Sequence, residues 1–270
     1  MRFRTLMLCE RELTVSGREA GQGDPVVLLH GVGTQSAMWR PQIEALSRSH
    51  HALALDLPGH GGSSPLPPDS GLAEFVHWLH RALAGLGLNR VSLVGHSLGA
   101  LIAAGFGASH PGMVSRIALL NGVHCRDAPM RASVLARAAA IRSNAQNTVS
   151  SLKRWFGDSD ADHAARVHVA SWLGAMDPAG YATAYAAFAN GDAIYADRLA
   201  TISCPLLALT GGDDQNSTPA MSEAMAEAAP LGRAVILPGH RHMVNMTAAD
   251  QVNKELRLWL ATTDRLQKAS

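Results

Sequence analysis

One serine of this chain stands in a pattern that is typical of nucleophilic catalysis. The segment Gly95-His96-Ser97-Leu98-Gly99 has the form G-x-S-x-G, with a β-branched run at 90–94 before it and a small-residue run at 100–108 after it. This strand-turn-helix context forces the serine into a strained backbone conformation, and the glycines remove Cβ atoms that would collide there. The pattern predicts that Ser97 Oγ projects from the sheet beside the positive end of a helix. Glycine-rich turns also bind phosphate, so the neighbouring motifs must decide between the two chemistries.

A general base and an orienting acid for that serine are available further along the chain. A serine nucleophile needs both, because its hydroxyl is a weak nucleophile at neutral pH. Asp213 and Asp214 follow the apolar run at 205–209, and His240 and His242 follow the last apolar run. The order Ser, Asp, His is the one expected with a nucleophile elbow, and the carboxyl ends of parallel strands meet in one crevice. We therefore expect a triad of Ser97 with one residue of each pair.

Five motifs in order make the chain resemble the α/β-hydrolase superfamily over essentially its full length. In that family the acid commonly stands three residues after its loop glycine, and the histidine likewise follows its glycine by three. Those spacings select Asp214 and His242, with Asp213 and His240 as the adjacent alternatives. The five motifs are His30-Gly31-Val32-Gly33, Asp56-Leu57-Pro58-Gly59-His60-Gly61, Gly95-His96-Ser97-Leu98-Gly99, the stretch from Gly211 to Asp214, and the stretch from Gly239 to His242.

The resemblance also implies roles for the loop around His30. The oxyanion hole would consist of the backbone N–H groups of Val32 and Leu98. Gly31 and Gly33 would let the chain approach the substrate closely, and His30 would hold its loop in place.

Four positions are expected to line the substrate pocket: Gly31, His96, Trp155 and Met243. His96 lies beside the nucleophile on a turn that directs it elsewhere, so a structural or pocket-edge position is expected for it. Asp56 ends an apolar run in a turn-forming loop, and its expected task is to brace that turn.

Alternating elements must position these residues. The pattern predicts a doubly wound, mostly parallel, eight-stranded sheet with helices on both faces, as expected when strands alternate with helices. Helices are expected at 39–48, 72–86, 100–108 and 248–260. The eight strands are predicted at 5–8, 12–15, 25–29, 51–55, 90–94, 116–120, 205–209 and 234–237.

The alternation breaks in a strand-poor, alanine-rich stretch at 124–200, which predicts an inserted helical cap. The core would then comprise 1–123 and 201–270. Helices are expected at 131–142, 147–156, 164–174 and 178–188. The first part of the insert is basic, which is typical of a solvated face and leaves open a contact of one cation with a substrate carboxylate. The cations are Arg126, Arg131, Arg137, Arg142, Lys153 and Arg154.

Composition limits the partners. With a net charge of +1 over 270 residues, the chain offers no counterpart for a polyanion or a membrane surface, and its N-terminal apolar stretch is too short for a signal peptide. Three scattered cysteines (Cys9, Cys125 and Cys204) suit a reduced, cytoplasmic protein. We expect a small-molecule substrate, no cofactor and no metal, because His77 and His80 have no third ligand close in sequence. A homo-oligomer is compatible with the sequence.

The expected reaction is acyl transfer to water. Serine as nucleophile argues against the haloalkane dehalogenase and epoxide hydrolase branches, which attack with aspartate. The segments 152–156 and 177–181 resemble caps of 3-oxoadipate enol-lactonases, so a serine hydrolase of small carboxylic esters or (enol-)lactones is predicted. A carbon-carbon bond hydrolase of ring-cleavage products, a cofactor-free perhydrolase or acyltransferase, and a non-enzymatic small-ligand receptor remain as alternatives.

Overall fold

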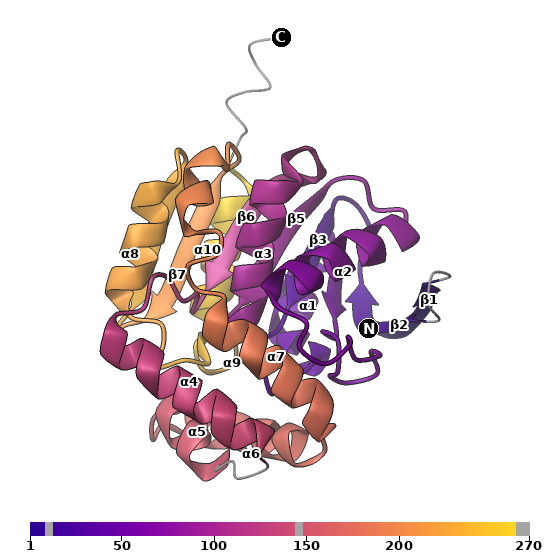
Figure 1. Cartoon of the computed structure of the whole chain (residues 1–270). Coiled ribbons are helices and arrows are strands. Elements are labelled where there is room, and N and C mark those ends of the chain that lie inside the picture. The colour runs from indigo at the N-terminus through magenta and orange to yellow at the C-terminus, as the bar shows by residue number, and fades with distance from the viewer. Residues whose placement is uncertain (9–12, 144–147, 263–270) are drawn as a thin grey trace.

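A computed structural model of the chain describes residues 1–8, 13–143 and 148–262 (Figure 1). Cys9, and the predicted element ends at Glu12 and Asn147, lie outside the described residues. In the described part, eight strands form one sheet in the order β1-β2-β4-β3-β5-β6-β7-β8. The strands are β1 (Arg2–Leu8), β2 (Leu13–Ala20), β3 (Pro25–Leu29), β4 (His51–Leu55), β5 (Val91–His96), β6 (Val114–Leu120), β7 (Leu206–Gly211) and β8 (Gly232–Leu237).

The predicted fold class is confirmed. β2 pairs antiparallel with β1 and with β4, and all other neighbouring strands run parallel. Every residue of β5 and of β7 is buried, as expected for parallel strands that carry helices on both faces. The register places Gly95 beside Leu29 and His96 beside Leu120. The loop after β3 and the turn after β5 therefore leave the sheet side by side.

Helices cover both faces of the sheet (Figure 1). α1 packs against α10 and α9, while α2 packs against α3, and α3 lies along β5 and β6. The remaining core helix, α8, follows β7 and packs on β7 and β8. The bounds are α1 (Arg40–Leu46), α2 (Leu72–Gly85), α3 (Leu98–Ser109), α8 (Pro219–Ala228), α9 (Val244–Thr247) and α10 (Ala249–Leu260), with 3-10 turns at η1 (Ser36–Trp39), η2 (Pro111–Met113) and η3 (Ala196–Thr201).

Four further helices, which we call the insert helices, come between β6 and β7 in the chain and gather at one end of the molecule (Figure 1). They are α4 (Ala128–Arg142), α5 (Thr148–Trp155), α6 (Asp160–Gly174) and α7 (Pro178–Asn190). Asp127, Ser159 and Asp177 start three of them by accepting hydrogen bonds from backbone N–H groups of the first turn, which satisfies donors that the helix leaves unpaired. The domain boundaries at 124 and 200 stay a prediction.

Two departures from the predicted elements have readily identified sequence signals. The helix expected at 39–48 is divided into η1 and α1, because Pro41 in the first turn lacks the N–H that would continue a hydrogen-bonded helix from its start. The helix α8 was not predicted, although Thr218 caps it and Pro219 stands at its first position. Within the described residues, no helix is long and apolar enough to cross a membrane.

Candidate active site

Ser97 occupies a strained turn between β5 and α3. Its backbone angles are φ 55° and ψ −113°, a conformation that L-residues rarely adopt and that stores about 1–3 kcal/mol. The backbone N–H of Ser97 donates to Leu120 O at 3.0 Å, which ties the turn to β6. Ser97 is 5% exposed and stands at the N-cap of α3. The strain predicted from the G-x-S-x-G pattern is therefore present at this serine.

The two glycines of the motif are required by backbone neighbours. A Cβ on Gly95 would lie 2.6 Å from Ala100 N and closer still to Gly99 O. A Cβ on Gly99 would lie 2.7 Å from His30 O and closer still to Leu29 O. These neighbours belong to the first turn of α3 and to the end of β3, which cannot turn away as a flexible side chain could. The glycines thus let α3 begin directly against the central strands.

Asp214 and His242 form a buried pair at the ends of β7 and β8. The Nδ1–H of His242 donates to Asp214 Oδ2 at 2.8 Å, and the two side chains are 4% and 0% exposed. Asn121, at the end of β6, donates from Nδ2 to the same Oδ2 at 2.8 Å, and the backbone N–H groups of Asn216 and Ser217 donate to Oδ1 at 2.8 and 3.1 Å. This arrangement fixes the imidazole with Nε2 as the nitrogen that can accept a proton.

The environment of Asp214 favours its ionised form. Burial alone would raise the pKa of this carboxyl, but the charge of His242 and the hydrogen bonds from His242, Asn121 and Asn216 together hold the pKa below its ordinary value. An ionised acid is what the pair requires, because it stabilises the imidazolium that forms when His242 accepts a proton.

The adjacent alternatives lie outside this arrangement. Asp213 is exposed, and its backbone N–H donates to His240 O at 2.9 Å. The His240 ring is half-buried, with Nε2 3.3 Å from the amide of Gln251. The structure therefore brings together Asp214 and His242, and leaves Asp213 and His240 apart from that pair.

His96, the residue before Ser97, contacts His242 directly. The His96 ring lies 5.0 Å from the His242 ring between centroids, and His96 Nε2 donates to His242 O at 2.8 Å. Among the described residues, no hydrogen bond joins Ser97 Oγ to the imidazole of His242. A serine hydroxyl reorients by rotation about χ1, and catalytic hydrogen bonds often tighten only when substrate binds.

Two backbone N–H groups beside Ser97 are available for an oxyanion. Those of Val32 and Leu98 donate to no protein acceptor within the described residues. The loop of Val32 approaches the elbow closely, since a Cβ on Gly31 would lie 2.9 Å from Ser97 Cβ. The next N–H along, that of Gly33, is occupied by His60 Nε2 at 3.2 Å. In the described part of the chain, the N–H groups of Val32 and Leu98 are thus free beside Ser97, and the oxyanion role expected for them stays a prediction.

Two side chains hold the loops around Val32. His30 is buried, donates from Nδ1 to Gly31 O at 2.7 Å and accepts from Leu57 N–H at Nε2 at 2.8 Å. Asp56 accepts from the N–H groups of Ser36 and Gly62 at 2.7 and 3.2 Å. The supporting role expected for His30 and for Asp56 therefore agrees with their contacts.

His60 and Asn121 are functional neighbours that the motifs did not single out. His60 bridges Pro58 O and Gly33 N–H, and burial, followed by the charge of His30, lowers its pKa to about 3. His60 belongs to the motif from Asp56 to Gly61, but the sequence does not indicate that it binds the N–H of Gly33, which is 27 residues away. Asn121 follows a predicted strand, and only the sheet order reveals that it faces Asp214.

Two of the expected pocket residues are enclosed by protein. His96 is 1% exposed, and burial, followed by the charge of His242, lowers its pKa to about 3. Met243 is also 1% exposed. A Cβ on Gly31 would point at the side chains of His96 and Ser97, and not into open space. The substrate-binding roles expected for Gly31, His96 and Met243 stay a prediction, and the burial of His96 agrees with the structural position expected for it.

Trp155, the fourth expected pocket residue, is positioned over the histidine. Its ring lies 6.0 Å from the His242 ring between centroids, and its carbonyl accepts the His242 N–H at 3.2 Å. A Cβ on Gly33 would lie 3.6 Å from Trp155 and 2.7 Å from Leu173, so the glycine admits side chains of the insert helices. Side chains of α5 and α6 therefore lie close to Gly33, and its expected approach to substrate stays a prediction.

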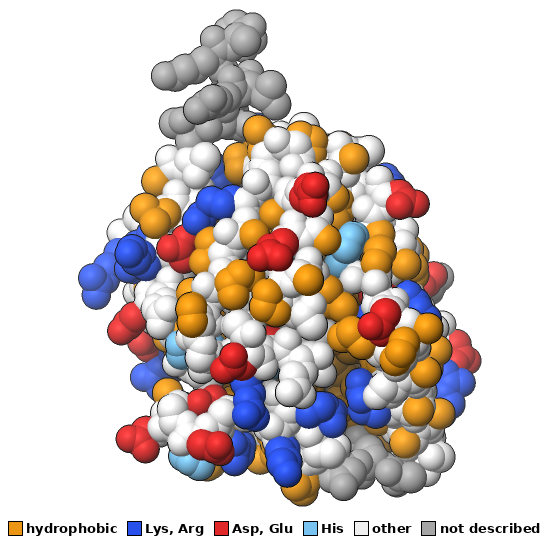
Figure 2. All heavy atoms as spheres, turned by 90° about the vertical axis from the view of Figure 1, so that its left-hand side faces the viewer, with side chains coloured by type: hydrophobic (Ala, Val, Ile, Leu, Met, Phe, Trp, Pro, Cys, Tyr) orange, Lys and Arg blue, Asp and Glu red, His pale blue; other side chains and the backbone are white. Residues whose placement is uncertain are grey.

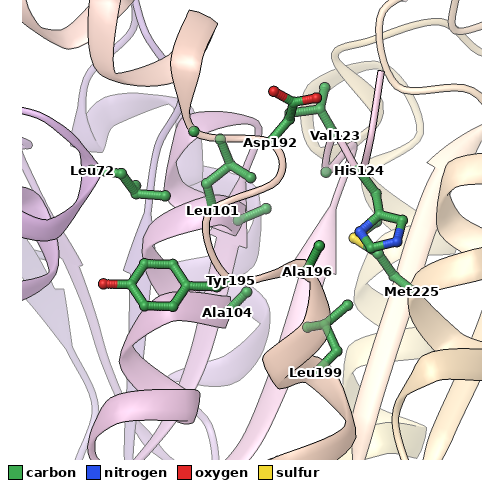
Figure 3. A pocket seen from close by; sticks show the side chains of 13 residues that line it. Leu72, Leu101, Ala104, Val123, His124, Asp192, Tyr195, Ala196, Leu199 and Met225 are labelled. Carbon is green, nitrogen blue, oxygen red and sulfur yellow. The ribbon is translucent and has the colours of Figure 1, made fainter. Parts of the chain in front are cut away.

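The cavities differ in what they can hold. Figure 3 shows an apolar cavity beside α3, lined by Leu101, Val123 and Leu199 among others, whose volume is about 20 Å³. That volume suits a single water. A larger groove of about 710 Å³ runs between Thr34, His60 and Trp172, next to the loop that holds Val32. A pocket of about 320 Å³ adjoins the Asp214 loop at Asn216. Both larger spaces are wide enough for a small substrate.

Metal ligands are not gathered in the described residues, where no three His, Cys, Asp or Glu side chains form a group that could hold an ion. The rings of His77 and His80, at 6.5 Å between centroids, stack in line with His110.

The chain matches known hydrolases in sequence and in fold. The family profile described as "Alpha/beta hydrolase family" matches residues 26–255. The (E)-2-((N-methylformamido)methylene)succinate hydrolase of Acinetobacter baylyi is 45% identical over 245 residues, which cover 91% of this chain and 93% of that protein. The enol-lactonase from Burkholderia xenovorans LB400 superposes with a TM-score of 0.85 at 24% identity, covering 97% and 100% of the two chains. A thermophilic esterase from Thermogutta terrifontis gives 0.85 at 24% identity over 96% and 98%. At these identities the two structures share the fold alone.

Proposed function

Since the chain belongs to the alpha/beta hydrolase family, we propose that it is a serine hydrolase that cleaves a small carboxylic ester or lactone through an acyl-enzyme intermediate. The observation that carries the proposal is the buried pair of Asp214 and His242, joined at 2.8 Å, below a strained Ser97. The resemblance predicted from the five motifs is confirmed by the family match. The roles of individual residues are our proposal.

The first half of the reaction forms the acyl-enzyme. Ser97 Oγ attacks the substrate carbonyl while His242 Nε2 takes its proton, and the charge of Asp214 stabilises the imidazolium. The N–H groups of Val32 and Leu98 bind the oxyanion, and one such donor contributes on the order of 3 kcal/mol to lowering the barrier. The imidazolium then returns the proton to the leaving oxygen, and the carbon–oxygen bond to the leaving group breaks.

The second half repeats these steps with water. His242 takes a proton from water, the hydroxide oxygen bonds to the acyl carbon, and the same N–H groups bind the second oxyanion. Collapse breaks the bond to Ser97 Oγ, which recovers the proton from His242. The products are a carboxylic acid and the alcohol, or a hydroxy acid from a lactone, and no cofactor enters the balance.

An amide is the second candidate bond. The Acinetobacter baylyi relative, by its printed name, hydrolyses a succinate that carries an N-methylformamido group, and the same steps release an amine when the leaving atom is nitrogen. A panel of short-chain esters, lactones and N-formyl amides assayed with wild-type protein and with Ser97→Ala tests the proposal. We expect multiple turnovers with at least one class and none with the variant, whose melting temperature stays that of the wild type. Equal turnover by Ser97→Ala would exclude the proposal, and binding without turnover would favour a receptor.

A further inference from the structure

A pocket of about 320 Å³ on the insert helices collects an unusual amount of positive charge. We call it the arginine pocket; it is lined by Arg126, Arg137 and Arg154, and also by Ser133, Gln215 and Asn216. Figure 2 shows Lys and Arg side chains gathered over the lower part of one face, the end at which the insert helices lie in Figure 1. Among the described residues lining the pocket, none is acidic.

Only part of this charge is neutralised by the protein. The buried Asp192 carboxylate pairs with Arg126 at 3.3 Å and with Arg131 at 3.0 Å, so one carboxylate serves two guanidinium groups. Arg137 and Arg154 form no ion pair within the described residues. Burial, followed by the positive charge of Arg137, lowers the pKa of Arg154. An anion placed between these two side chains would remove that repulsion.

The two unpaired arginines are held in place while donor groups stay free. Arg137 donates from Nε to the Tyr185 hydroxyl at 3.1 Å and from Nη1 to Ser133 Oγ at 2.8 Å. Arg154 donates to Ser150 and Ser151 at 3.3 and 3.2 Å, and its buried Nε has no partner within the described residues. A guanidinium fixed by neutral partners, with donors to spare, is arranged for a carboxylate.

The arginine pocket adjoins the proposed catalytic groups on two sides. Asn216 lines the pocket, and its N–H donates to Asp214 Oδ1 at 2.8 Å. Arg154 precedes Trp155, whose ring and carbonyl both contact His242. One wall residue thus contacts the acid directly, and another is next in the chain to the tryptophan that contacts the base.

We propose that Arg137 and Arg154 bind a carboxylate of the substrate, so that the enzyme prefers acyl compounds that carry a negative charge away from the bond that is cleaved. This inference rests on the proposed function, because it assigns a substrate class to that site. A charge-assisted contact of this kind typically changes binding by about 10-fold or more.

A pair of matched esters tests it. The ratio of kcat/KM for 4-nitrophenyl hydrogen succinate to that for 4-nitrophenyl butyrate separates carboxylate recognition from catalysis, because the two acyl groups have equal length. We expect the wild type to favour the succinate ester, and Arg137→Gln and Arg154→Gln each to lower the ratio by about 10-fold. Arg142→Gln is the control: it removes the same charge from α4, but Arg142 is 66% exposed and pairs with Asp69 on the surface. Its ratio should stay that of the wild type.

A binding measurement keeps the inference testable if a variant folds poorly or if neither ester is cleaved. Titration of succinate into Ser97→Ala, with and without Arg137→Gln, should show affinity falling by about 10-fold when the arginine is lost. Ester ratios that match the wild type in both arginine variants, together with a succinate affinity of Ser97→Ala that does not change when Arg137→Gln is added, would overturn the assignment of the pocket. If the wild type cleaves no ester but succinate still binds in a way that depends on Arg137, the proposed function is refuted while the carboxylate site is supported.

Discussion

Replacing Gly99 with alanine perturbs the proposed nucleophile turn without touching a reacting group. The new Cβ would lie 2.7 Å from His30 O and closer still to Leu29 O. Both atoms are backbone at the end of the buried strand β3, so α3 must move away from the sheet. Overpacking of this kind destabilises a protein by about 1–3 kcal/mol, and we expect the upper end because no flexible side chain can yield. For a chain of this size, 3 kcal/mol corresponds to a melting temperature lower by about 6–12 °C.

Activity should fall further than stability suggests. A shift of α3 also moves Leu98 N–H and Ser97, and a displacement near 1 Å in such groups lowers turnover by about 10²-fold. Gly174→Ala is the control, because a Cβ there meets nothing within 4 Å in helix α6 and should leave stability unchanged or raise it by up to about 1 kcal/mol. Denaturant unfolding and ester kinetics measure both effects. If Gly99→Ala matches the wild type in stability and in kcat/KM, the account of the elbow packing is wrong.

Three further changes probe the charges around His242. Asp214→Asn should lower the free energy of unfolding mainly above pH 4. The lowered pKa of Asp214 stabilises the folded state above the unfolded value of about 3.9, and that contribution is lost as the pH falls through the folded pKa. If this is wrong, denaturant titrations from pH 3 to 8 would show a constant difference between variant and wild type. The free energy of unfolding should fall less steeply in His96→Gln than in the wild type as the pH drops from 6.5 to about 3. In the wild type the buried ring of His96 stays neutral over this range while the unfolded chain takes up a proton. An equal slope in variant and wild type would contradict this. Asn121→Gly, which tolerates the positive φ of 47°, should lose about 1.5–3 kcal/mol through the missing hydrogen bond to Asp214; a loss below 0.5 kcal/mol would show that this bond contributes little.

Much of the fold could be predicted from the sequence because its signals are local. Apolar runs such as 25–29 mark strands buried on both faces, and the glycines around Ser97 mark a turn where backbone meets backbone. Only the resemblance to the α/β-hydrolase superfamily, through the spacing from Gly211 to Asp214 and from Gly239 to His242, separates the paired side chains from their neighbours Asp213 and His240. Each of these patterns lies within a few residues of the group that it positions.

What could not be predicted depends on contacts between distant segments. Asn121 and Asp214 meet because β6 and β7 are neighbours in the sheet, which no local pattern states. The close neighbours of Gly33 include Leu173 and Trp155 of the insert helices, which no local pattern states either. The hydrogen bond from His96 to His242 O likewise joins residues that are 146 positions apart in the chain. Helix α8 could have been predicted, since Thr218 and Pro219 are residues typical of the N-cap and first turn of a helix.

Covalent labelling by a fluorophosphonate tests the central claim most directly, because the reagent reacts with a serine only when a neighbouring base activates it. Intact-protein mass spectrometry should show one adduct per chain, mapped to the peptide that holds Ser97, with labelling abolished by Ser97→Ala and strongly slowed by His242→Gln but not by His240→Gln. An adduct elsewhere, or labelling at Ser97 that proceeds at the wild-type rate without His242, would contradict the claim that these side chains work together.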